Sequence, residues 1–300
     1  MEKHDVIIIG GGPAALMCAR YLKLANIDYK LITSILGGAL FQATNVFNFP
    51  THKQIEGSLI ATEMVEATDI DCVEFDEVVN YKNHIVTCKS GAEFFGKAIV
   101  IASGSNPIKL SIGSDLPCIH YCVLCDSYLY RDKTVVVLGG GESAVQSAIF
   151  LSSICNDVYV VFRKDDMKIC SYSRELLKKK GNIYLYSGKV LDDITSTYSN
   201  KYNFIFSSNH GEPDFSLIVD GCFVCYGSTP ATTFLKNSDI QLNEKGYVLH
   251  GFENKPYTAT TEDGCFVAGD CMANIYRQIV ISIGNGATCA LDVIKYLEGK

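Results

Sequence analysis

The sequence predicts an α/β protein made of two nucleotide-binding domains, the second inserted into the first. Three observations predict this fold class. The 300 residues are enough for two domains of about 100–200 residues each. A strand, three glycines and an apolar helix follow one another twice, and a strand ending in a Gly-x-x-Pro turn also occurs twice. The copies of each pattern lie roughly 125 residues apart, which is an internal repeat of domain size.

The repeat also predicts where the domains meet. The matching segments are DVIIIGGGPAALMCARYL (5–22) with TVVVLGGGESAVQSAIFL (134–151), and AIVIASGSNP (98–107) with GCFVCYGSTP (221–230). After the second copy a polar stretch leads into another apolar strand, CFVAGD, and a final apolar helix that ends near Glu298. We therefore expect the first domain at 1–111 and 247–300, with the inserted domain at 112–246.

Composition excludes several classes of function. The chain is 48% hydrophobic and 20% charged, as in ordinary globular proteins, and its formal net charge of −7 argues against general binding of nucleic acid or anionic membranes. We find no secretory signal and no stretch of about 18 apolar residues, so we expect a cytoplasmic protein. Cysteines are normally reduced there, and a closely spaced pair is more often catalytic or metal-binding than structural.

Both glycine-rich turns are typical of Rossmann-like dinucleotide sites. Gly10, Gly12 and Ala15 follow the first strand and open a helix. In this pattern the first glycine allows a tight turn, the second lets the backbone approach a pyrophosphate, and the small third residue lets helix and strand pack. Gly139, Gly141 and Ala144 repeat the pattern in the second copy. Two such turns on repeated units indicate two bound dinucleotides.

The residues after the second strand of each copy differ. Arg163, Lys164 and Lys168 follow that strand in the inserted copy, and basic residues there favour the 2′-phosphate of NADP over NAD. No charged residue directly follows the matching strand of the first copy, where Gly37 and Gly38 form another point of close approach. The carboxylate of Asp270, at the end of CFVAGD, is suited to accept hydrogen bonds from sugar hydroxyls.

One pair among the thirteen cysteines stands directly before an aspartate, in HYCVLCDSYLY (120–130). If a helix begins at Cys125, that thiol lies at the positive helix end, where thiolates are favoured. Asp126 is then either an acid–base group or a helix N-cap. His120 is close enough in sequence to assist the dithiol, but we expect it to be exposed to solvent instead.

A second close pair, Cys222 and Cys225, raises the possibility of a zinc site with the first. Because LIVDGCFVCYG (217–227) reads as one buried strand, side chains three apart in it point to opposite faces, which disfavours a shared metal or bond. We expect the remaining cysteines to be small core or surface residues.

The chain resembles the low-molecular-weight thioredoxin reductases over essentially its whole length. The resemblance rests on the first glycine turn and on GGALFQATNVFNFP (37–50), CVLCD, GGGESA, FRKDDMK, FVAGD and IYRQIVISIGNGATCALDVIKYL, in matching order and spacing. It implies FAD on the first domain, NADPH on the inserted domain, a homodimer, and a redox disulfide that passes electrons to thioredoxin. Ser127 stands where the family usually has glycine.

The resemblance also implies roles for single residues. Cys125 would face the flavin, Cys122 would attack the partner disulfide, and Asp126 would be the acid–base group. The residues implied for FAD are Gly10, Gly12, Ala15, Gly37, Gly38, Asn45, Asp270, Arg277 and Gln278. Those implied for NADPH are Gly139, Gly141, Ala144, Arg163, Lys164 and Lys168.

The predicted function is therefore an NADPH-dependent flavoenzyme that reduces thioredoxin through Cys122 and Cys125. The dithiol and the NADPH turn share one domain, so we expect that domain to rotate about hinges near 111–118 and 243–250. The alternatives are a flavin-dependent dithiol oxidase, a reductase of another thiol protein such as a peroxiredoxin, and a non-catalytic nucleotide-binding sensor.

Overall fold

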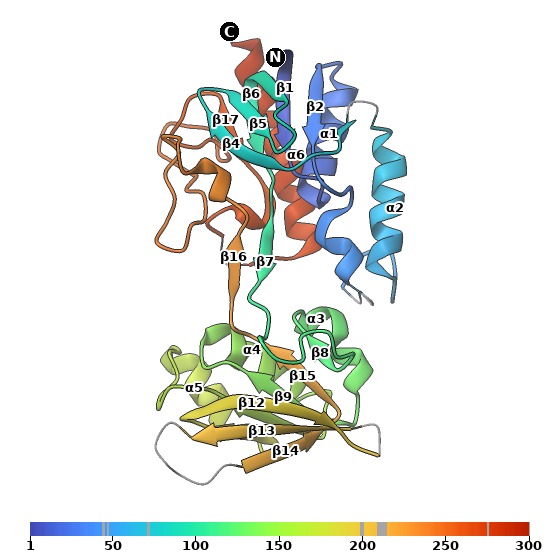
Figure 1. The fold of residues 1–300 in the computed structure, drawn as a ribbon, viewed down its shortest axis with the longest axis vertical. Coiled ribbons are helices and arrows are strands. Elements are labelled where there is room, and N and C mark those ends of the chain that lie inside the picture. The colour runs from blue at the N-terminus through green and yellow to red at the C-terminus, as the bar shows by residue number, and fades with distance from the viewer. Residues whose placement is uncertain are drawn as a thin grey trace. The chain divides into compact units, whose positions relative to one another are not determined.

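The computed structural model describes residues 1–43, 46, 48–70, 73–198, 201–208, 215–274 and 276–299. It divides the chain into two compact units, both of the α/β class (Figure 1). Unit 1 comprises Met1–Thr44, Phe49–Asn106 and Thr229–Lys300, and unit 2 comprises Asn45–Asn48 and Pro107–Ser228. The predicted fold class is confirmed, since each unit contains a sheet of parallel strands that alternate with helices.

Unit 1 is built on a seven-stranded sheet in the order β3-β2-β1-β6-β5-β4, with β17 paired to β6. The strands are β1 (Glu2–Ile9), β2 (Tyr29–Ile32), β3 (Val73–Glu74), β4 (Val78–Lys82), β5 (Ile85–Cys88), β6 (Glu93–Ile101) and β17 (Cys265–Val267). Ile9 lies opposite both Ile32 and Ile101, and Ile101 lies opposite Val267. Four parallel strands therefore end at the same edge, where the loops of open α/β sheets bind ligands.

Helices cover this sheet because their apolar faces match its alternating side chains. They are α1 (Pro13–Leu24), α2 (Gly57–Thr68) and α6 (Ile279–Glu298), with 3-10 turns η1 (Gly38–Gln42), η3 (Thr233–Leu235) and η4 (Gly269–Cys271). An added Cβ at Gly286 would lie 2.2 Å from the Ala14 carbonyl oxygen, so α1 and α6 are in backbone contact. In the described part of the chain, α6 is the one helix long and apolar enough to cross a membrane, although Cys289, Ala290 and Val293 bury one face of it in the unit 1 core.

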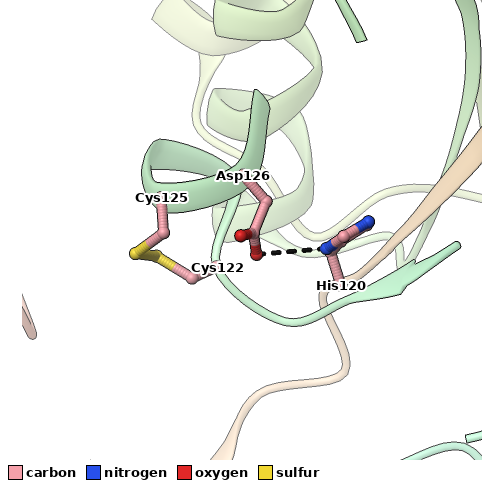
Figure 2. Close-up of a disulfide and its surroundings, with 4 residues drawn as sticks. All are labelled: His120, Cys122, Cys125 and Asp126. Atoms are coloured by element: carbon pink, nitrogen blue, oxygen red, sulfur yellow. Dashed lines mark ion pairs between the residues drawn. A yellow bond between two sulfur atoms is a disulfide. The ribbon is translucent and has the colours of Figure 1, made fainter. Parts of the chain in front are cut away.

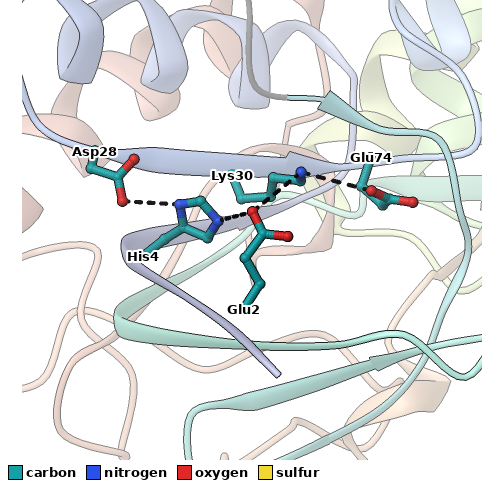
Figure 3. Close-up of polar contacts among 5 residues, drawn as sticks. All are labelled: Glu2, His4, Asp28, Lys30 and Glu74. Carbon is teal, nitrogen blue, oxygen red and sulfur yellow. Dashed lines mark hydrogen bonds and ion pairs between the residues drawn. The ribbon is translucent and has the colours of Figure 1, made fainter.

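Charged side chains join the first three strands of unit 1 (Figure 3). The two ring nitrogens of His4 contact Asp28 at 2.9 Å and Glu2 at 2.8 Å. The Lys30 ammonium lies 3.6 Å from Glu2 and 3.7 Å from Glu74. We call these five residues the β1–β3 charge network. Because its carboxylates are largely exposed, the network contributes little to stability.

Unit 2 repeats this plan with a five-stranded sheet in the order β11-β10-β9-β15-β8. Its strands are β8 (Ile119–His120), β9 (Thr134–Leu138), β10 (Asp157–Val161), β11 (Ile183–Tyr186) and β15 (Gly221–Val224). One face packs on α4 (Glu142–Leu151) and α5 (Ser171–Lys178). The other packs on an antiparallel sheet of β12 (Lys189–Ser196), β13 (Tyr202–Ser208) and β14 (Phe215–Val219).

The segment read from the sequence as one strand, 217–227, is in fact divided between two sheets. β14 ends at Val219 and β15 begins at Gly221. The break falls at Asp220, whose carboxylate accepts a hydrogen bond from the Thr134 amide at 2.9 Å. The Asp220 amide also donates to the Thr134 carbonyl oxygen at 2.8 Å, so Asp220 is bonded to the start of β9 where the chain passes from the antiparallel sheet to the parallel one.

The chain passes between the units at two short strands that pair with each other, β7 (Ser105–Pro107) and β16 (Ser228–Pro230). Backbone bonds from Ile108 to Gly227 and from Ala231 to Gly104, each 3.0 Å, flank the pair. The chain therefore passes from one unit to the other between residues 106 and 107 and between residues 228 and 229. The bounds predicted from the sequence for the inserted domain are 112 and 246 instead. Residues 107–111 belong to unit 2, and 229–246 belong to unit 1. The predicted hinge segments 111–118 and 243–250 each lie inside a unit rather than at a crossing.

Candidate redox and nucleotide-binding sites

The two cysteines of the CVLC segment form a disulfide, with their Cα atoms 5.3 Å apart. They lie where β8 gives way to the short helix α3 (Val123–Asp126). The Asp126 amide donates to the Cys122 carbonyl oxygen at 3.1 Å, which makes Cys122 the N-cap of this turn. One helical turn brings residues i and i+3 to the same face, so the two sulfurs meet. The helix therefore begins before Cys125, the start considered from the sequence, because Cys122 is its N-cap and Val123 its first residue.

The side chains of Asp126 and His120 contact each other beside the disulfide (Figure 2). His120 Nδ1 lies 3.2 Å from Asp126 Oδ2, and both side chains are about one-tenth exposed. The prediction that His120 is exposed is wrong because Tyr130 and Phe223 pack against its ring. Asp126 occupies the N-cap position of η2 (Ser127–Tyr130) but makes no capping bond with its side chain. Ser127, at the family's glycine position, is buried, and its hydroxyl contacts no polar partner among the described residues.

The other cysteines in the described part of the chain are free thiols. Burial raises the pKa of Cys118 and of Cys155 to about 11, and raises that of Cys222 well above its usual range. These thiols therefore stay protonated and unreactive at neutral pH. Cys222 packs in the core facing the antiparallel sheet, whereas Cys225, directly after β15, packs on the α4 side. The predicted separation of this pair is confirmed.

One cluster of possible metal ligands occurs among the described residues, formed by His84, Glu262 and Cys265 in unit 1. The ring nitrogens of His84 lie 3.0 and 2.9 Å from backbone carbonyl oxygens of Gly96 and Asp263. The Tyr81 hydroxyl lies 2.7 Å from Glu262 and 2.8 Å from Cys265. Because the ligand atoms are engaged in these contacts, the cluster serves as a hydrogen-bonded part of the core.

The first glycine turn lies at the edge of unit 1 where the parallel strands end. Gly10 has φ +119°, and a Cβ there would lie 2.2 Å from the Ala102 carbonyl oxygen. Gly12 caps α1, and a Cβ there would meet nothing within 4 Å. Open backbone at a helix N-terminus is what a pyrophosphate requires, so the residues fit a dinucleotide. Ala15 is fully buried, as the small third position requires.

The Gly37–Gly38 turn closes against the first glycine turn. The Gly37 amide donates to the Gly11 carbonyl oxygen at 2.7 Å, and a Cβ on Gly38 would lie 3.0 Å from the Gly12 Cα. Both glycines have positive φ, which residues with side chains rarely adopt. The structure thus brings together Gly10, Gly12, Gly37 and Gly38. Asn45 lies outside the described residues.

Asp270 lies in η4, directly after β17, at the same edge of the sheet. Burial raises the pKa of its carboxyl, although the Ser282 hydroxyl donates to it at 2.9 Å. The Arg277 guanidinium lies 4.1 Å from the centre of the Tyr247 ring and donates to the Asp270 carbonyl oxygen at 3.3 Å. Gln278 is the N-cap residue of α6. A buried carboxylate with acceptor capacity near a glycine turn fits a sugar hydroxyl.

The second glycine turn has the same geometry in unit 2. Gly139 has φ +143°, and a Cβ there would lie 2.6 Å from the Cys225 carbonyl oxygen. Gly141 caps α4 and has nothing within 4 Å of an added Cβ, while Ala144 is fully buried. The open backbone of Gly141 again fits a pyrophosphate.

The predicted basic residues gather at this turn. Arg163 and Lys164 follow the end of β10 and are exposed. The Lys168 amide donates to the Gly140 carbonyl oxygen at 3.0 Å, so its exposed side chain begins beside the glycines. Sequence reasoning missed Glu142, the first residue of α4, which accepts a hydrogen bond from the Cys170 amide at 3.0 Å. A hydrogen bond from the Ser173 hydroxyl lowers the pKa of Glu142, which ties α5 to the turn.

Comparison with known proteins identifies the class to which these sites belong. Residues 4–286 match the family model "Pyridine nucleotide-disulphide oxidoreductase". The chain is 32% identical to "Thioredoxin reductase" of Escherichia coli O157:H7, across 99% of this chain and 97% of that one. It is 31% identical to "34.2 kDa protein in rubredoxin operon" of Clostridium pasteurianum, across 100% and 99%. A solved structure, "Thioredoxin reductase from Giardia duodenalis", matches at 25% identity with a TM-score of 0.88, covering 99% and 100%.

The chain belongs to the pyridine nucleotide-disulphide oxidoreductase family. It is therefore an oxidoreductase, and the cofactors of this family are FAD and NADPH. The predicted resemblance is confirmed, and it extends over nearly the whole chain.

Proposed function

We propose that this protein is a thioredoxin reductase that carries electrons from NADPH through FAD to the Cys122–Cys125 disulfide and then to thioredoxin. The observation that carries this proposal is the disulfide itself, with Asp126 and His120 beside it. It lies in a unit that also holds a glycine turn with exposed basic residues. Structural disulfides are rare in reducing compartments, so a bonded pair with an adjacent carboxylate favours redox chemistry.

We assign FAD to unit 1 and NADPH to unit 2. In unit 1, the backbone at Gly12, Gly37 and Gly38 would face the pyrophosphate, Asp270 a ribose hydroxyl, and Arg277 and Gln278 the flavin end. In unit 2, the backbone at Gly141 would face the pyrophosphate, and Arg163, Lys164 and Lys168 the 2′-phosphate. Gly10, Ala15, Gly139 and Ala144 would support these contacts by packing rather than by touching the cofactor.

Exposure favours different roles for the two cysteines. Cys122 is partly exposed, whereas Cys125 is only 7% exposed. When bound, FAD and NADPH supply the two electrons that reduce the disulfide, and two protons complete the thiols. The Cys122 thiolate would attack one sulfur of the partner disulfide, and the sulfur released would take up a proton. Cys125 would then give its proton to Asp126 and attack Cys122, which releases the second partner sulfur.

The dithiol and the NADPH turn belong to the same unit, yet both must reach the flavin. We therefore propose that unit 2 has two orientations, with β7 and β16 as the segments that change. Only short strands connect the units there, which supports this placement of the hinges. We further propose a cytoplasmic homodimer without membrane or nucleic-acid partners, on the strength of the family assignment and the acidic net charge.

An anaerobic NADPH titration watched at the flavin absorbance band tests the proposal. The wild-type protein should take up two reducing equivalents beyond those of its flavin, because the disulfide opens. The variant Cys125→Ser cannot form the disulfide and should take up only the equivalents of the flavin. Equal uptake by both proteins would remove the disulfide from the pathway. A flavin that NADPH does not bleach, together with rapid oxygen-dependent oxidation of small dithiols, would identify a dithiol oxidase instead.

A further inference from the structure

His120 joins two groups on either side of it. It is the last residue of β8, and its ring lies between Asp126 of α3 and Tyr130 of η2. Nδ1 is 3.2 Å from the Asp126 carboxylate, and Nε2 is 2.7 Å from the Tyr130 hydroxyl. Figure 2 shows the Asp126 carboxylate on the side of the imidazole that faces the disulfide. The carboxylate, the imidazole and the phenol are therefore linked in that order, with the carboxylate on the side of the disulfide.

The surroundings hold this imidazole in place and limit which groups can change charge. Phe223 packs against the ring at a centroid distance of 5.4 Å, and the Tyr130 ring meets it edge-on at 5.2 Å. Among the described residues, the other ionisable groups around the Tyr130 end are Cys118, Cys222, Tyr202, Lys133 and Asp220. Burial keeps both thiols protonated and also raises the pKa of Tyr130, so the phenol remains a neutral donor at neutral pH. A proton that reaches this cluster is thus shared by Asp126 and His120.

The same heavy-atom positions accommodate the cluster with and without an extra proton. Without it, Nδ1–H donates to the carboxylate and the Tyr130 O–H donates to Nε2. With it, the imidazolium donates from both nitrogens, to the carboxylate and to the phenol oxygen, while the hydroxyl hydrogen rotates away. In both states Nδ1, Nε2 and the Tyr130 oxygen each keep one hydrogen-bond partner, so proton uptake requires only that the Tyr130 hydroxyl hydrogen turn.

We propose that His120 is a positioning residue for proton transfer at the dithiol: it aims the Asp126 carboxylate and stores the proton that Asp126 removes from a thiol. This inference deepens the proposed function and rests on it for its place in the reaction. The step is the transfer of one proton from a cysteine Sγ to Asp126 and on to His120, leaving a thiolate. No electron moves, and the same proton returns when a partner sulfur leaves.

The far end of the cluster offers a way to solvent. Tyr130 lines a surface pocket together with Lys133 and Asp220. Nε2 contacts the Tyr130 hydroxyl, so we place the exchange of the stored proton with water at this pocket, whose lining is of mixed polarity.

The test measures thiolate formation directly and needs neither NADPH nor thioredoxin. Protein reduced with dithiothreitol is treated with iodoacetamide between pH 5 and 9, and alkylation of Cys122 is followed by mass spectrometry, which separates it from exposed Cys170. In His120→Asn, an amide replaces Nδ1 as the donor to Asp126 but cannot accept a proton. We expect the midpoint of the alkylation profile to rise by about one pH unit, with alkylation at pH 7 slowed about tenfold.

Two further variants keep the result interpretable. Tyr130→Phe removes only the hydroxyl, and should shift the midpoint in the same direction by a smaller amount. His4→Asn is the matched control, because His4 also contacts an aspartate through Nδ1, at 2.9 Å, in unit 1 (Figure 3). It should leave the profile unchanged. Thermal melts and retained FAD verify folding of each variant.

Midpoints equal to wild type in folded His120→Asn and Tyr130→Phe would overturn the inference. The proposed function fails by a different result, namely an absent disulfide equivalent in the NADPH titration. A shifted alkylation profile together with a failed titration would therefore retain the role of His120 and reject thioredoxin reduction.

Discussion

The two glycine turns have the same backbone but different surroundings. In each, the first glycine has positive φ and lies against a carbonyl oxygen of the neighbouring strand's loop, and the second faces open space. Beyond the second strand they diverge. In unit 1, buried Thr33 leads into the Gly37–Gly38 turn that contacts Gly12. In unit 2, exposed Arg163 and Lys164 take that place. Packing fixes the turn in both units, and it is to the residues after the second strand that we assign the distinction between the two nucleotides.

The largest expected effect comes from the first glycine of each turn. Gly10→Ala places a Cβ 2.2 Å from the Ala102 carbonyl oxygen, and Gly139→Ala places one 2.6 Å from the Cys225 carbonyl oxygen. Both positions also have a φ that alanine rarely adopts. We expect each to destabilise its unit by about 3 kcal/mol or more. Gly10→Ala should lose FAD, measured as flavin absorbance per chain. Gly139→Ala should keep FAD but lose at least 100-fold in NADPH-dependent bleaching.

Gly141→Ala is the matched control for Gly139→Ala, since its added Cβ meets nothing within 4 Å. Its melting temperature should stay near wild type while NADPH affinity falls, because the methyl group occupies the place of the pyrophosphate. Equal melting temperatures for all three variants would show that packing does not require the first glycine of either turn. That result would contradict the conclusion that the two turns share this packing requirement.

A smaller effect is expected from the basic residues that distinguish unit 2. Removing Arg163 or Lys164 (R163A, K164A) takes away a charge-assisted contact worth about 1.5–3 kcal/mol. KM for NADPH should rise by roughly 10- to 100-fold, with much less change for NADH and no change in FAD content. Steady-state kinetics with both nucleotides measure this. Equal losses with NADPH and NADH would show that these side chains do not contact the 2′-phosphate.

The smallest effect concerns Asp270, which lies in η4 at the sheet edge of unit 1. Burial raises the folded-state pKa of this carboxyl, so its ionised form costs stability above that pKa, and the cost disappears as pH falls below the unfolded value. Asp270→Asn should therefore raise the melting temperature of the FAD-free protein by a few degrees at pH 7, with no gain near pH 3. FAD retention should fall. A gain that is independent of pH would contradict this account.

Much of the fold could be predicted because it rests on local patterns. The glycine turns, the final helix and the basic residues after β10 each occupy a few consecutive positions with a fixed physical requirement. The unit bounds could not be placed from the repeat, because the crossing depends on pairing between β7 and β16, which are more than a hundred residues apart. Asp220 likewise divides a continuous apolar run through a bond to Thr134.

In the candidate site, too, the sequence predicted the features set by local patterns but not those set by packing between distant segments. The spacing of Cys122 and Cys125 singled out the pair, the family resemblance implied its redox role, and the adjacent carboxylate was evident from the sequence. The environment of His120 was not, because Phe223 reaches its ring from a strand far along the chain. The sequence does show His120 two residues before Cys122 and Tyr130 four residues after Asp126. That these two side chains contact each other could not be predicted without knowing how Phe223 packs against them.

The paired crossing strands have a consequence for engineering. The Thr229 hydroxyl contacts the Asn106 carbonyl oxygen at 3.5 Å, so the two ends of the inserted segment enter and leave side by side. Residues 107–228 make up unit 2 apart from Asn45–Asn48, and because their two ends lie side by side, we expect that a short linker would suffice to rejoin unit 1 after their excision. The same adjacency makes this junction a natural place to graft a foreign nucleotide-binding module or to open new termini by circular permutation.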